Sequence, residues 1–288
     1  MTTRRVFSTS TSSGGRSAAL QWASEVSPGT PRSVLYLEPP SVNDGVVADQ
    51  WDSHGSPIEL RCERFRTLVD ELYEADTYDG PATYISSAER QWIVEEALSR
   101  LDDTDHPLHR ADDPAVGLIQ QSEELLTLLE FAGVITAKEV EQRLTQEGLP
   151  ELAQSLSQFV KLVHEVRADS FNDVKTFRSE RFRHVLNAGQ PLVESELSEI
   201  EVVIIGSFQT LSPQERDIIE LLADPLDTGV VLTRVTDDYE LSGADDAIRR
   251  ISHWYEDLGF TRHEVDSTRS RSSRELAAAS LYKYDTEH

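Results

Sequence analysis

The sequence lacks features that would place it in several familiar classes of protein. Its one cysteine, Cys62, among 288 residues excludes an intrachain disulfide and every zinc site built on several cysteines. No apolar run approaches the roughly 18 residues that span a bilayer, so we expect no membrane segment. The pair Arg4-Arg5 is not followed by the hydrophobic region of a secretory signal. These absences predict a cytoplasmic protein.

Positive charge is also scarce. Lysine and arginine together number 27 against 52 aspartates and glutamates, which gives a formal net charge of -25. The four lysines are Lys138, Lys161, Lys175 and Lys283. With 38% hydrophobic residues the chain still has enough apolar surface for a core, so we interpret it as an acidic, halophilic protein whose self-repulsion is screened by molar salt. In such a chain net charge neither favours nor excludes DNA, because a DNA-binding surface need only be locally less acidic.

The most hydrophobic β-branched stretch is Ile200–Ile205, and it stops at a glycine. Its four consecutive apolar residues, Val202–Ile205, predict a central strand of a parallel sheet, buried on both faces. Gly206 and Ser207 then mark the carboxyl end of that strand, where open α/β sheets bind ligands. A P-loop ATPase carries a magnesium-binding aspartate and a catalytic glutamate at this point. Both acids are missing, so Gly206-Ser207 is interpreted as a degenerate Walker B motif.

A second strand is predicted near the amino terminus, at Arg4–Phe7, followed by a Ser/Gly-rich loop and a helix from Ser17 to Ala23. Aligned with the P-loop pattern G-x-x-x-x-G-K-[ST], the loop keeps Gly15 and Ser17 but has Ser10 for the first glycine and Arg16 for the lysine. The planar arginine fork does not substitute for a compact lysine charge.

We therefore predict a degenerate nucleotide-binding loop that holds no cofactor, made of Ser10, Gly14, Gly15, Arg16 and Ser17. A Ser/Gly-rich turn before a helix is also common without any such role. The order of strand, loop, helix and later buried strand predicts an α/β, RecA-like P-loop fold with a parallel sheet.

Three segments carry a resemblance to a known family. Val203–Arg216 resembles the "strand, G-F, T-P-x-E-R" segment of the AddB/RecC-type subunits of helicase-nuclease complexes, which have a UvrD-like superfamily 1 helicase fold with ATPase motifs that are often degenerate. Tyr84–Leu98 resembles the helix that enters their all-helical 1B insertion, and Phe177–Phe182 resembles the returning helix. The resemblance covers only the first RecA-like domain and its insertion, without the second RecA-like domain or the nuclease domain.

The resemblance implies a domain organisation and a function. Residues 1–85 and 191–266 would form the two parts of the RecA-like domain, 86–190 the helical insertion, and 267–288 a linker with a short helix. The implied function is that of a pseudo-ATPase without catalytic residues, which acts as a scaffold or DNA-handling component of a DNA recombination and repair system. Its implied partner is a helicase or nuclease subunit or a second RecA-like domain, with single-stranded DNA as a further candidate. In the family a Thr-Phe pair contacts this DNA. In this sequence only the phenylalanine of that pair has a counterpart, which is Phe65.

Two other functions stay open. One is an active or slow P-loop ATPase or DNA helicase fragment that uses Arg16 together with Asp237 or Asp238. The other is a regulatory interaction protein from a truncated gene. For the scaffold we predict an exposed interface made of Phe208 and Gln209, with Phe208 beside Arg16, because an exposed aromatic next to an arginine is typical of a hot spot. The alternative is that Phe208 packs beneath the turn at Leu211.

The remaining patterns concern helices and one acidic segment. The stretch Asp102–Asp113, which contains two histidines, is interpreted as a solvated loop rather than a metal site, because it lies between helices, contains Pro107 and is followed by Pro114. We expect helices to begin at Ser122, at a Thr136–Glu139 capping box, at Pro150 and at Pro213. A further helix is expected over Ala244–Leu258, ending at Gly259. Trp51–Gly55 is expected to be a loop.

Overall fold

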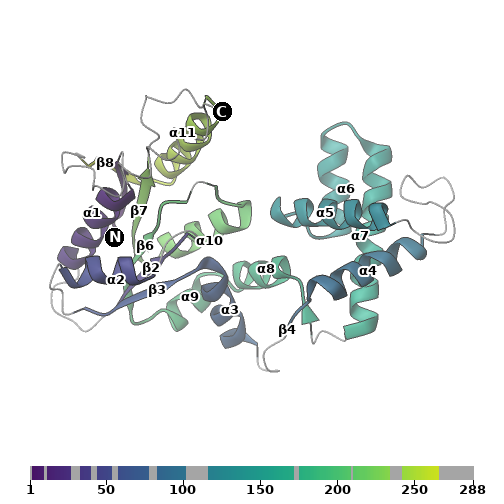
Figure 1. Cartoon of the computed structure of the whole chain (residues 1–288), viewed down its shortest axis with the longest axis horizontal. Coiled ribbons are helices and arrows are strands. Elements are labelled where there is room, and N and C mark those ends of the chain that lie inside the picture. The colour runs from purple at the N-terminus through teal and green to yellow at the C-terminus, as the bar shows by residue number, and fades with distance from the viewer. Residues whose placement is uncertain are drawn as a thin grey trace, which may run out of the picture. The chain divides into compact units, whose positions relative to one another are not determined.

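The computed structural model describes residues 2–9, 12–26, 33–39, 44–53, 58–77, 83–101, 116–171, 175–208, 210–233 and 242–265. The chain divides into two compact units (Figure 1). Unit 1 comprises Met1–Cys62, Ile200–Gln209 and Leu226–His288, and unit 2 comprises Glu63–Glu199 and Thr210–Pro225. None of the helices in the described ranges combines the length and the apolar composition needed to cross a membrane.

Unit 1 is built on a six-stranded sheet with the order β3-β2-β6-β7-β1-β8. Its strands are β1 (Arg4–Thr9), β2 (Ser33–Leu37), β3 (Leu60–Glu63), β6 (Ile200–Ile205), β7 (Asp227–Thr233) and β8 (Thr261–Glu264). The pairs β2–β6, β6–β7, β7–β1 and β1–β8 are all parallel. The structure therefore confirms an α/β fold of the RecA-like class with a parallel sheet, and it places β7 between the two strands that carry the degenerate motifs.

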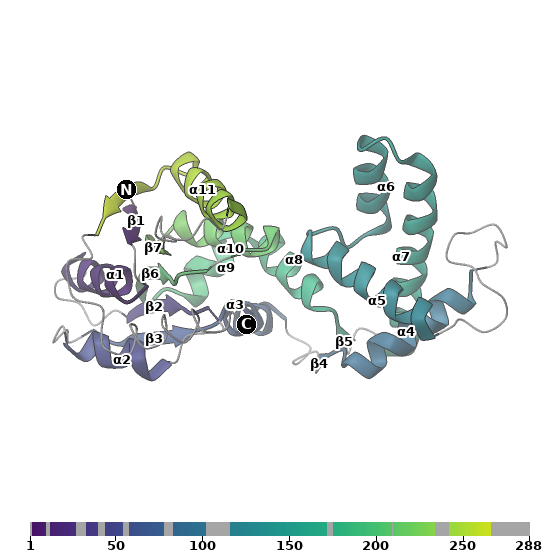
Figure 2. The same cartoon turned by 45° about the horizontal axis from the view of Figure 1, so that its top comes forward.

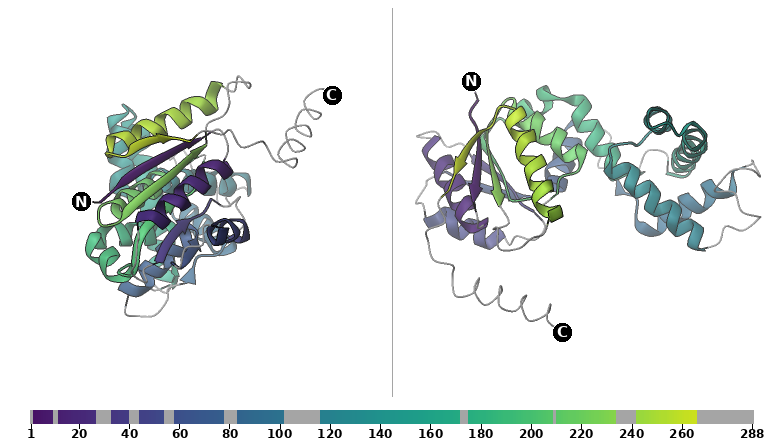
Figure 3. Two further views of the ribbon diagram at one scale, coloured as in Figure 1. Left: turned by 90° about the vertical axis from the view of Figure 1, so that its left-hand side faces the viewer. Right: turned by 90° about the horizontal axis from the view of Figure 1, so that it is seen from above.

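Helices cover the sheet of unit 1 on both faces. Helices α1 (Ser12–Val26) and α2 (Asp44–Ser53) lie along one face and α11 (Ser242–Asp257) along the other (Figures 2 and 3). This arrangement follows from right-handed crossovers, because α1 leads from β1 toward one edge of the sheet while α11 leads from β7 toward the opposite edge. The predicted central strand is confirmed, since all four side chains of Val202–Ile205 are fully buried.

Two elements of unit 1 were not predicted. The segment Trp51–Gly55, expected to be a loop, begins inside α2, where the buried Trp51 indole donates to the carbonyl oxygen of Ile58 at 2.9 Å. Strand β8 is short, polar and at the edge of the sheet, so it has no buried run that a pattern could detect. The helix predicted over Ala244–Leu258 is confirmed as α11, and Gly259 after it has a φ of +82°.

Unit 2 is mostly helical, as expected for the predicted insertion, but it is not all-helical, because strand β5 lies inside residues 86–190. Its helices are α3 (Phe65–Asp76), α4 (Ser87–Ser99), α5 (Val116–Phe131), α6 (Ala137–Gln146), α7 (Pro150–Phe171), α8 (Arg178–Ala188), α9 (Gln190–Glu196) and α10 (Pro213–Ala223). A two-stranded parallel sheet joins β4 (Thr83–Tyr84) to β5 (Lys175–Thr176). Helices α4 to α7 share one core, in which Ile93, Phe159 and Val163 are fully buried.

Helix starts in unit 2 follow the capping signals in part. The Thr136–Glu139 capping box is present, and a second box at Ser212–Glu215 precedes α10, which begins at the predicted Pro213. The predicted start at Ser122 is wrong, because α5 begins at Val116 and Ser122 lies buried inside it. Serine marks a helix start only where no apolar pattern extends further toward the amino terminus, and here Ile119 extends it.

A buried arginine joins the two ends of the insertion. Arg181 of α8 is 3% exposed and donates to Asp70 of α3 at 2.8 Å and, through Nε, to Thr176 of β5 at 3.1 Å. Its guanidinium also lies 4.0 Å from the ring centroid of Tyr84 in β4, and the Tyr84 hydroxyl donates to Asp70. The two segments that resemble the entering and returning helices therefore meet, although Tyr84 is in a strand and α4 begins only at Ser87.

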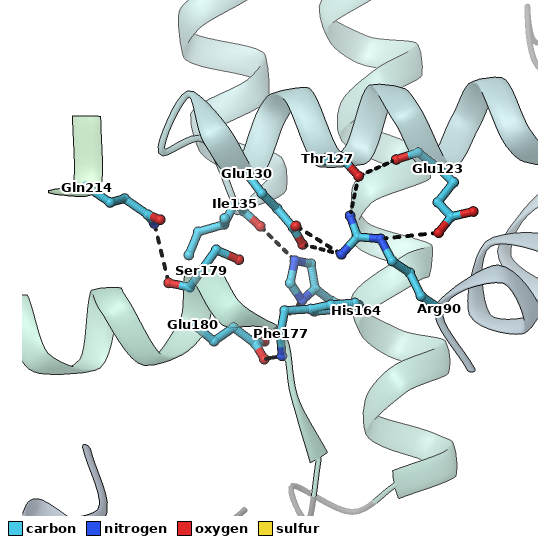
Figure 4. Close-up of polar contacts among 10 residues, drawn as sticks. All are labelled: Arg90, Glu123, Thr127, Glu130, Ile135, His164, Phe177, Ser179, Glu180 and Gln214. Carbon is cyan, nitrogen blue, oxygen red and sulfur yellow. Dashed lines mark hydrogen bonds and ion pairs between the residues drawn. The ribbon is translucent and has the colours of Figure 1, made fainter. Parts of the chain in front are cut away.

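A second charged contact ties α4 to α5 (Figure 4). The Arg90 guanidinium lies 2.9 Å from the Glu130 carboxylate, donates to the Thr127 hydroxyl at 3.2 Å, and lies 5.4 Å from the ring centroid of Phe177. Burial raises the pKa of Glu130, and the charge of Arg90 opposes that rise. Such a partly buried pair fixes how two helices pack more than it adds to their stability.

Unit 2 is larger than the predicted insertion. It contains α3, α9 and α10, which lie in the residues that the resemblance assigns to the RecA-like domain, 1–85 and 191–266. The predicted C-terminal linker and helix, 267–288, lie outside the described residues.

Candidate functional site

The predicted site lies at the carboxyl edge of the sheet in unit 1, where four neighbouring strands end. In the order of the sheet, β2 ends at Leu37, β6 at Ile205, β7 at Thr233 and β1 at Thr9. Because the strands are parallel, these ends meet at one edge, which is where open α/β sheets bind ligands. The structure thus brings the residues after β1 and those after β6 to the same edge, as the sequence predicts.

The loop after β1 differs from the prediction. Helix α1 begins at Ser12, so Gly14, Gly15, Arg16 and Ser17 lie in its first turns rather than in a loop, and Ser10 lies outside the described residues. Only two residues separate β1 from α1. The helix extends over two glycines because burial of residues such as Leu20 and Trp22 outweighs the weak helix propensity of glycine.

Gly15 serves the packing of α1 on the sheet. A Cβ atom at this position would lie 2.5 Å from Cγ2 of Thr9 in β1 and 2.9 Å from Cγ1 of Val231 in β7, closer than real contacts allow. Any side chain would therefore push the helix away from the two strands. The glycine that matches the P-loop pattern is explained by this close approach of helix and sheet.

Arg16 is buried and points to protein groups. It is 8% exposed, and its Nε donates to the Oε1 atom of Gln50 in α2 at 2.5 Å. Burial raises the pKa of Tyr36 to about 12, and the Arg16 charge beside the Tyr36 hydroxyl opposes that rise while Glu38 adds to it. The arginine that replaces the P-loop lysine thus belongs to a buried polar cluster with Tyr36, Glu38 and Gln50.

Three members of this cluster, Tyr36, Glu38 and Gln50, were not predicted as site residues. Glu38 is 2% exposed and follows β2 directly, so a carboxylate does lie at the sheet edge, one strand away from the expected position after β6. A signal existed, since an acid comes immediately after the apolar run of β2 and before two prolines. Gln50 gave no signal, because its polar neighbours in α2 resemble a loop.

The residues after β6 are closely packed. Gly206 donates its amide to the carbonyl oxygen of Leu37 at 2.8 Å, and a Cβ atom here would lie 2.7 Å from Cδ of Pro39. The hydroxyl of Ser207 forms a hydrogen bond of 2.7 Å with that of Thr233 at the end of β7. Gly206 and Ser207 therefore tie β6 to β2 and β7, and the chain provides no acid at these two positions.

The predicted interface is described only in part. Phe208 is half-buried and its amide donates to Gly206 at 2.9 Å, whereas Gln209 and the acids Asp237 and Asp238 lie outside the described residues. Arg16 was expected to be exposed beside Phe208, and this is wrong because Arg16 is buried. Phe65, the family's candidate for DNA contact, is 3% exposed and packs in the core.

The chemistry open to this edge is narrow. Among the described residues, no group of three histidine, cysteine or carboxylate side chains is arranged to hold a metal ion, and the stretch Asp102–Asp113 lies outside them. The cluster offers a tyrosine hydroxyl, a side-chain amide, a buried carboxyl group and a buried guanidinium, which are groups that join strands and helices. Searches against protein-family models and against curated proteins found no match to this chain.

Proposed function

We propose that this protein is a catalytically inactive, helicase-like pseudo-ATPase. In this proposal unit 1 is a RecA-like domain that no longer binds ATP, and the chain acts as a scaffold or DNA-handling component of a DNA recombination and repair helicase-nuclease system. A partner subunit, or a second RecA-like domain, supplies the catalysis. The observation that carries the proposal is the burial of Arg16 against Gln50 at the position of the phosphate-binding lysine.

Binding of a nucleotide at this edge would have to disrupt the buried cluster. Arg16 would leave Gln50 and Tyr36, and each buried hydrogen-bonding group left without a partner costs about 1–3 kcal/mol. Phosphoryl transfer also depends on a magnesium ligand and a water-orienting acid, which the chain lacks after β6.

The helicase-nuclease part of the proposal rests on the resemblance together with the placement of its segments. The strand of Val203–Arg216 is β6 of a RecA-like sheet, and the T-P-x-E-R-like end of the segment forms the capped start of α10. The two other segments flank the helices α4 to α7, and they meet where the Arg181 guanidinium lies 4.0 Å from the ring centroid of Tyr84. The placement of β6 supports the resemblance, whereas Tyr84 lies in a strand and α10 belongs to unit 2.

The first test is nucleotide binding. Calorimetry of the whole chain with ATP and magnesium, in KCl concentrated enough to keep it folded, should show no binding, and no phosphate should be released. Micromolar ATP binding that is lost in an Arg16→Ala variant whose fold is intact would overturn the pseudo-ATPase proposal.

The second test addresses the partner. The question is whether a neighbouring reading frame encodes a second RecA-like domain and a nuclease domain. Co-expression of the two products should give a stable complex, and the complex should bind single-stranded DNA more tightly than the neighbour's product alone. A complex with unchanged DNA affinity and unchanged stability of the neighbour would contradict the scaffold and DNA-handling roles.

A further inference from the structure

Unit 2 contains a cleft of about 650 Å³ that the proposed function does not use. It lies between the amino-terminal end of α6, where Ile135 and Ala137 line it, and the helices α7 and α8. Each of these two helices contributes residues spaced three, four and seven positions apart, which therefore lie on one face of the helix. They are Lys161, His164, Glu165 and Ala168 from α7, and Glu180, Arg183, His184 and Asn187 from α8. The volume is in the range of sites for small molecules.

The lining of the cleft differs from the chain as a whole in its charge balance. Lysine and arginine are outnumbered by 27 to 52 in the whole sequence. In the cleft the basic side chains are Lys161, Arg167 and Arg183, with His164 and His184 beside them, and the acids are Glu165 and Glu180. Glu139 pairs with Arg183 and Asp76 pairs with His184, so the charges around the cleft are nearly balanced while the chain as a whole is acidic. An anion is therefore repelled less here than by a surface with the average charge of this protein.

The floor of the cleft is held by its own contacts (Figure 4). The His164 ring lies 2.6 Å from the carbonyl oxygen of Ile135 through Nε2 and 3.5 Å from the Glu180 carboxylate through Nδ1. Glu180 also accepts the backbone amide of Phe177 at 2.8 Å and lies 3.4 Å from the Arg167 guanidinium. These contacts fix α7, α8 and the segment before α6 around the cavity, so its shape does not depend on a ligand.

The rim, by contrast, has donors to spare. Arg183 is partly exposed and uses one terminal nitrogen for Glu139 at 2.5 Å, its one ion-pair partner among the described residues. A guanidinium has five N–H donors, so most of those of Arg183 remain for a ligand. Lys161 is 68% exposed and has a single weak pair with Glu165 at 3.5 Å. Asn187 lies one helical turn beyond Arg183.

We propose that this cleft binds a phosphate-bearing small molecule whose phosphate oxygens accept hydrogen bonds from Arg183 and Lys161. Phosphate suits this pair, because arginine binds it through two parallel N–H donors and lysine through a compact charge. The cavity is larger than inorganic phosphate, so the organic part of a phosphate ester fits against Ile135, Ala137 and Ala168. The inference stands independently of the pseudo-ATPase proposal, since no residue of unit 1 enters it.

The test is a calorimetric titration of the whole chain with thymidine 5′-monophosphate, with inorganic phosphate and with a short oligothymidylate. Electrostatic binding weakens in salt, so the lowest KCl concentration at which the chain stays folded is used. We expect saturable binding of the monophosphate, and each of the variants Arg183→Gln and Lys161→Gln should weaken it by about tenfold, since a charge-assisted hydrogen bond is lost. The matched control is Arg178→Gln, which removes an exposed arginine of the same helix outside the cleft.

The possible outcomes distinguish a phosphate ester from free phosphate as the ligand, and they also define the results that contradict the proposal. Binding of inorganic phosphate with the same sensitivity to both variants supports the site with free phosphate as its ligand. No binding of either small anion, or binding that survives both substitutions, overturns it. Binding of the oligothymidylate alone also overturns it, in favour of an extended nucleic-acid surface. Lys161→Gln keeps the experiment decisive if Arg183→Gln disturbs α6 through Glu139, because an exposed i,i+4 pair adds only tenths of a kcal/mol to stability.

Discussion

Arg16 in unit 1 and Arg183 in unit 2 show how the same side chain can be committed to the fold or left for a ligand. Arg16 is buried and its partners are an amide and a tyrosine of its own unit, whereas Arg183 is partly exposed and holds one carboxylate at the rim of a cleft. A buried charge is stable only while its partners stay in place, so it cannot exchange them for a ligand without a cost of several kcal/mol. A partly exposed arginine exchanges them for water or phosphate at little cost.

The difference extends to the two surroundings. The sheet edge of unit 1 is closed by a glycine without room for a side chain and by the bond between Ser207 and Thr233. The cleft of unit 2 has an internal volume and a rim of donors. The described residues that match a motif in the sequence are therefore closely packed, while the cleft that carries no motif is open. The predictions below follow from this contrast.

The largest effect is expected from Gly206→Val. The new Cβ atom would lie 2.7 Å from Pro39 and 2.8 Å from the carbonyl oxygen of Leu37, so β2 and β6 must separate. We expect a loss of about 3 kcal/mol or more in the free energy of unfolding, measured by urea denaturation, and faster hydrogen exchange in β2 and β6 than in α7. The control is Gly117→Ala in α5, where no atom lies within 4 Å of the new methyl group. Equal stabilities of the two variants would contradict the closed edge.

A smaller loss, of about 3 kcal/mol at most, is expected in unit 2 from Asp70→Asn. This substitution removes the carboxylate that faces Arg181, whose side chain is buried, and an uncompensated buried charge is strongly destabilising. Arg66→Gln is the matched control, because Arg66 is 57% exposed and lies 3.8 Å from the same aspartate. We expect less than about 0.5 kcal/mol from it. Hydrogen exchange should rise at β4 and β5 in the first variant only, and a uniform rise across both units would count against a local role for Asp70.

The fold was predictable where local signals and burial agree. The apolar run of β6, the capping box at Thr136, Pro150, Pro213 and Gly259 each gave the right element, because a single strong local preference coincides with the tertiary structure. The failures are α2, β8 and the start of α5, where the pattern is polar, short or continued by packing from elsewhere. Local patterns cannot detect elements that form because a neighbouring surface buries them.

The position of the candidate site was predictable from the sequence, but the burial of its side chains was not. The sequence placed Gly206 and Arg16 at one edge of a sheet, which the structure confirms. It could not show that Arg16 is buried, because its partners Gln50 and Tyr36 come from α2 and β2, which are far from it in the sequence. For the same reason the cleft of α6, α7 and α8 carries no motif at all. Tertiary contacts decide whether a side chain is buried and which groups it binds. The spacing of residues in one sequence does not reveal these contacts.

Alkaline titration offers a further comparison of the two units. The pKa of Tyr36 in unit 1 is raised to about 12 by burial, and that of Tyr84 in unit 2 to about 12 by burial and by its hydrogen bond to Asp70. The pKa of a tyrosine in an unfolded chain is about 10. Below pH 10 the hydroxyl is protonated in both the folded and the unfolded state, so its contribution to the free energy of unfolding is fully present. As the pH rises from 10 through 12, the unfolded state loses the proton first, so the free energy of unfolding falls.

Tyr36→Phe and Tyr84→Phe should each reduce this loss of stability between pH 10 and 12. Tyr36→Phe should have the larger effect, because Tyr36 is fully buried and Tyr84 only half-buried. The measurement is the free energy of unfolding at several pH values, with tyrosinate absorbance to identify the late-titrating groups. If neither variant changes the slope, the two hydroxyls are not held protonated by the fold, and the buried cluster around Arg16 is looser than the structure indicates.

The smallest effect is expected from a substitution that places an acid after β6. Ser207→Asp introduces a carboxylate after β6, where the magnesium ligand of an active enzyme would lie. We expect it to lose about 1 kcal/mol of stability, because the hydrogen bond to Thr233 is replaced, and to gain no ATP binding. Arg16 would still be held by Gln50. Ser207→Ala is the control for the lost hydrogen bond. If calorimetry with ATP and magnesium detected binding to the aspartate variant and not to the alanine variant, the edge would be an open site that lacks only its metal ligand, and the contrast between the closed edge of unit 1 and the open cleft of unit 2 would be wrong.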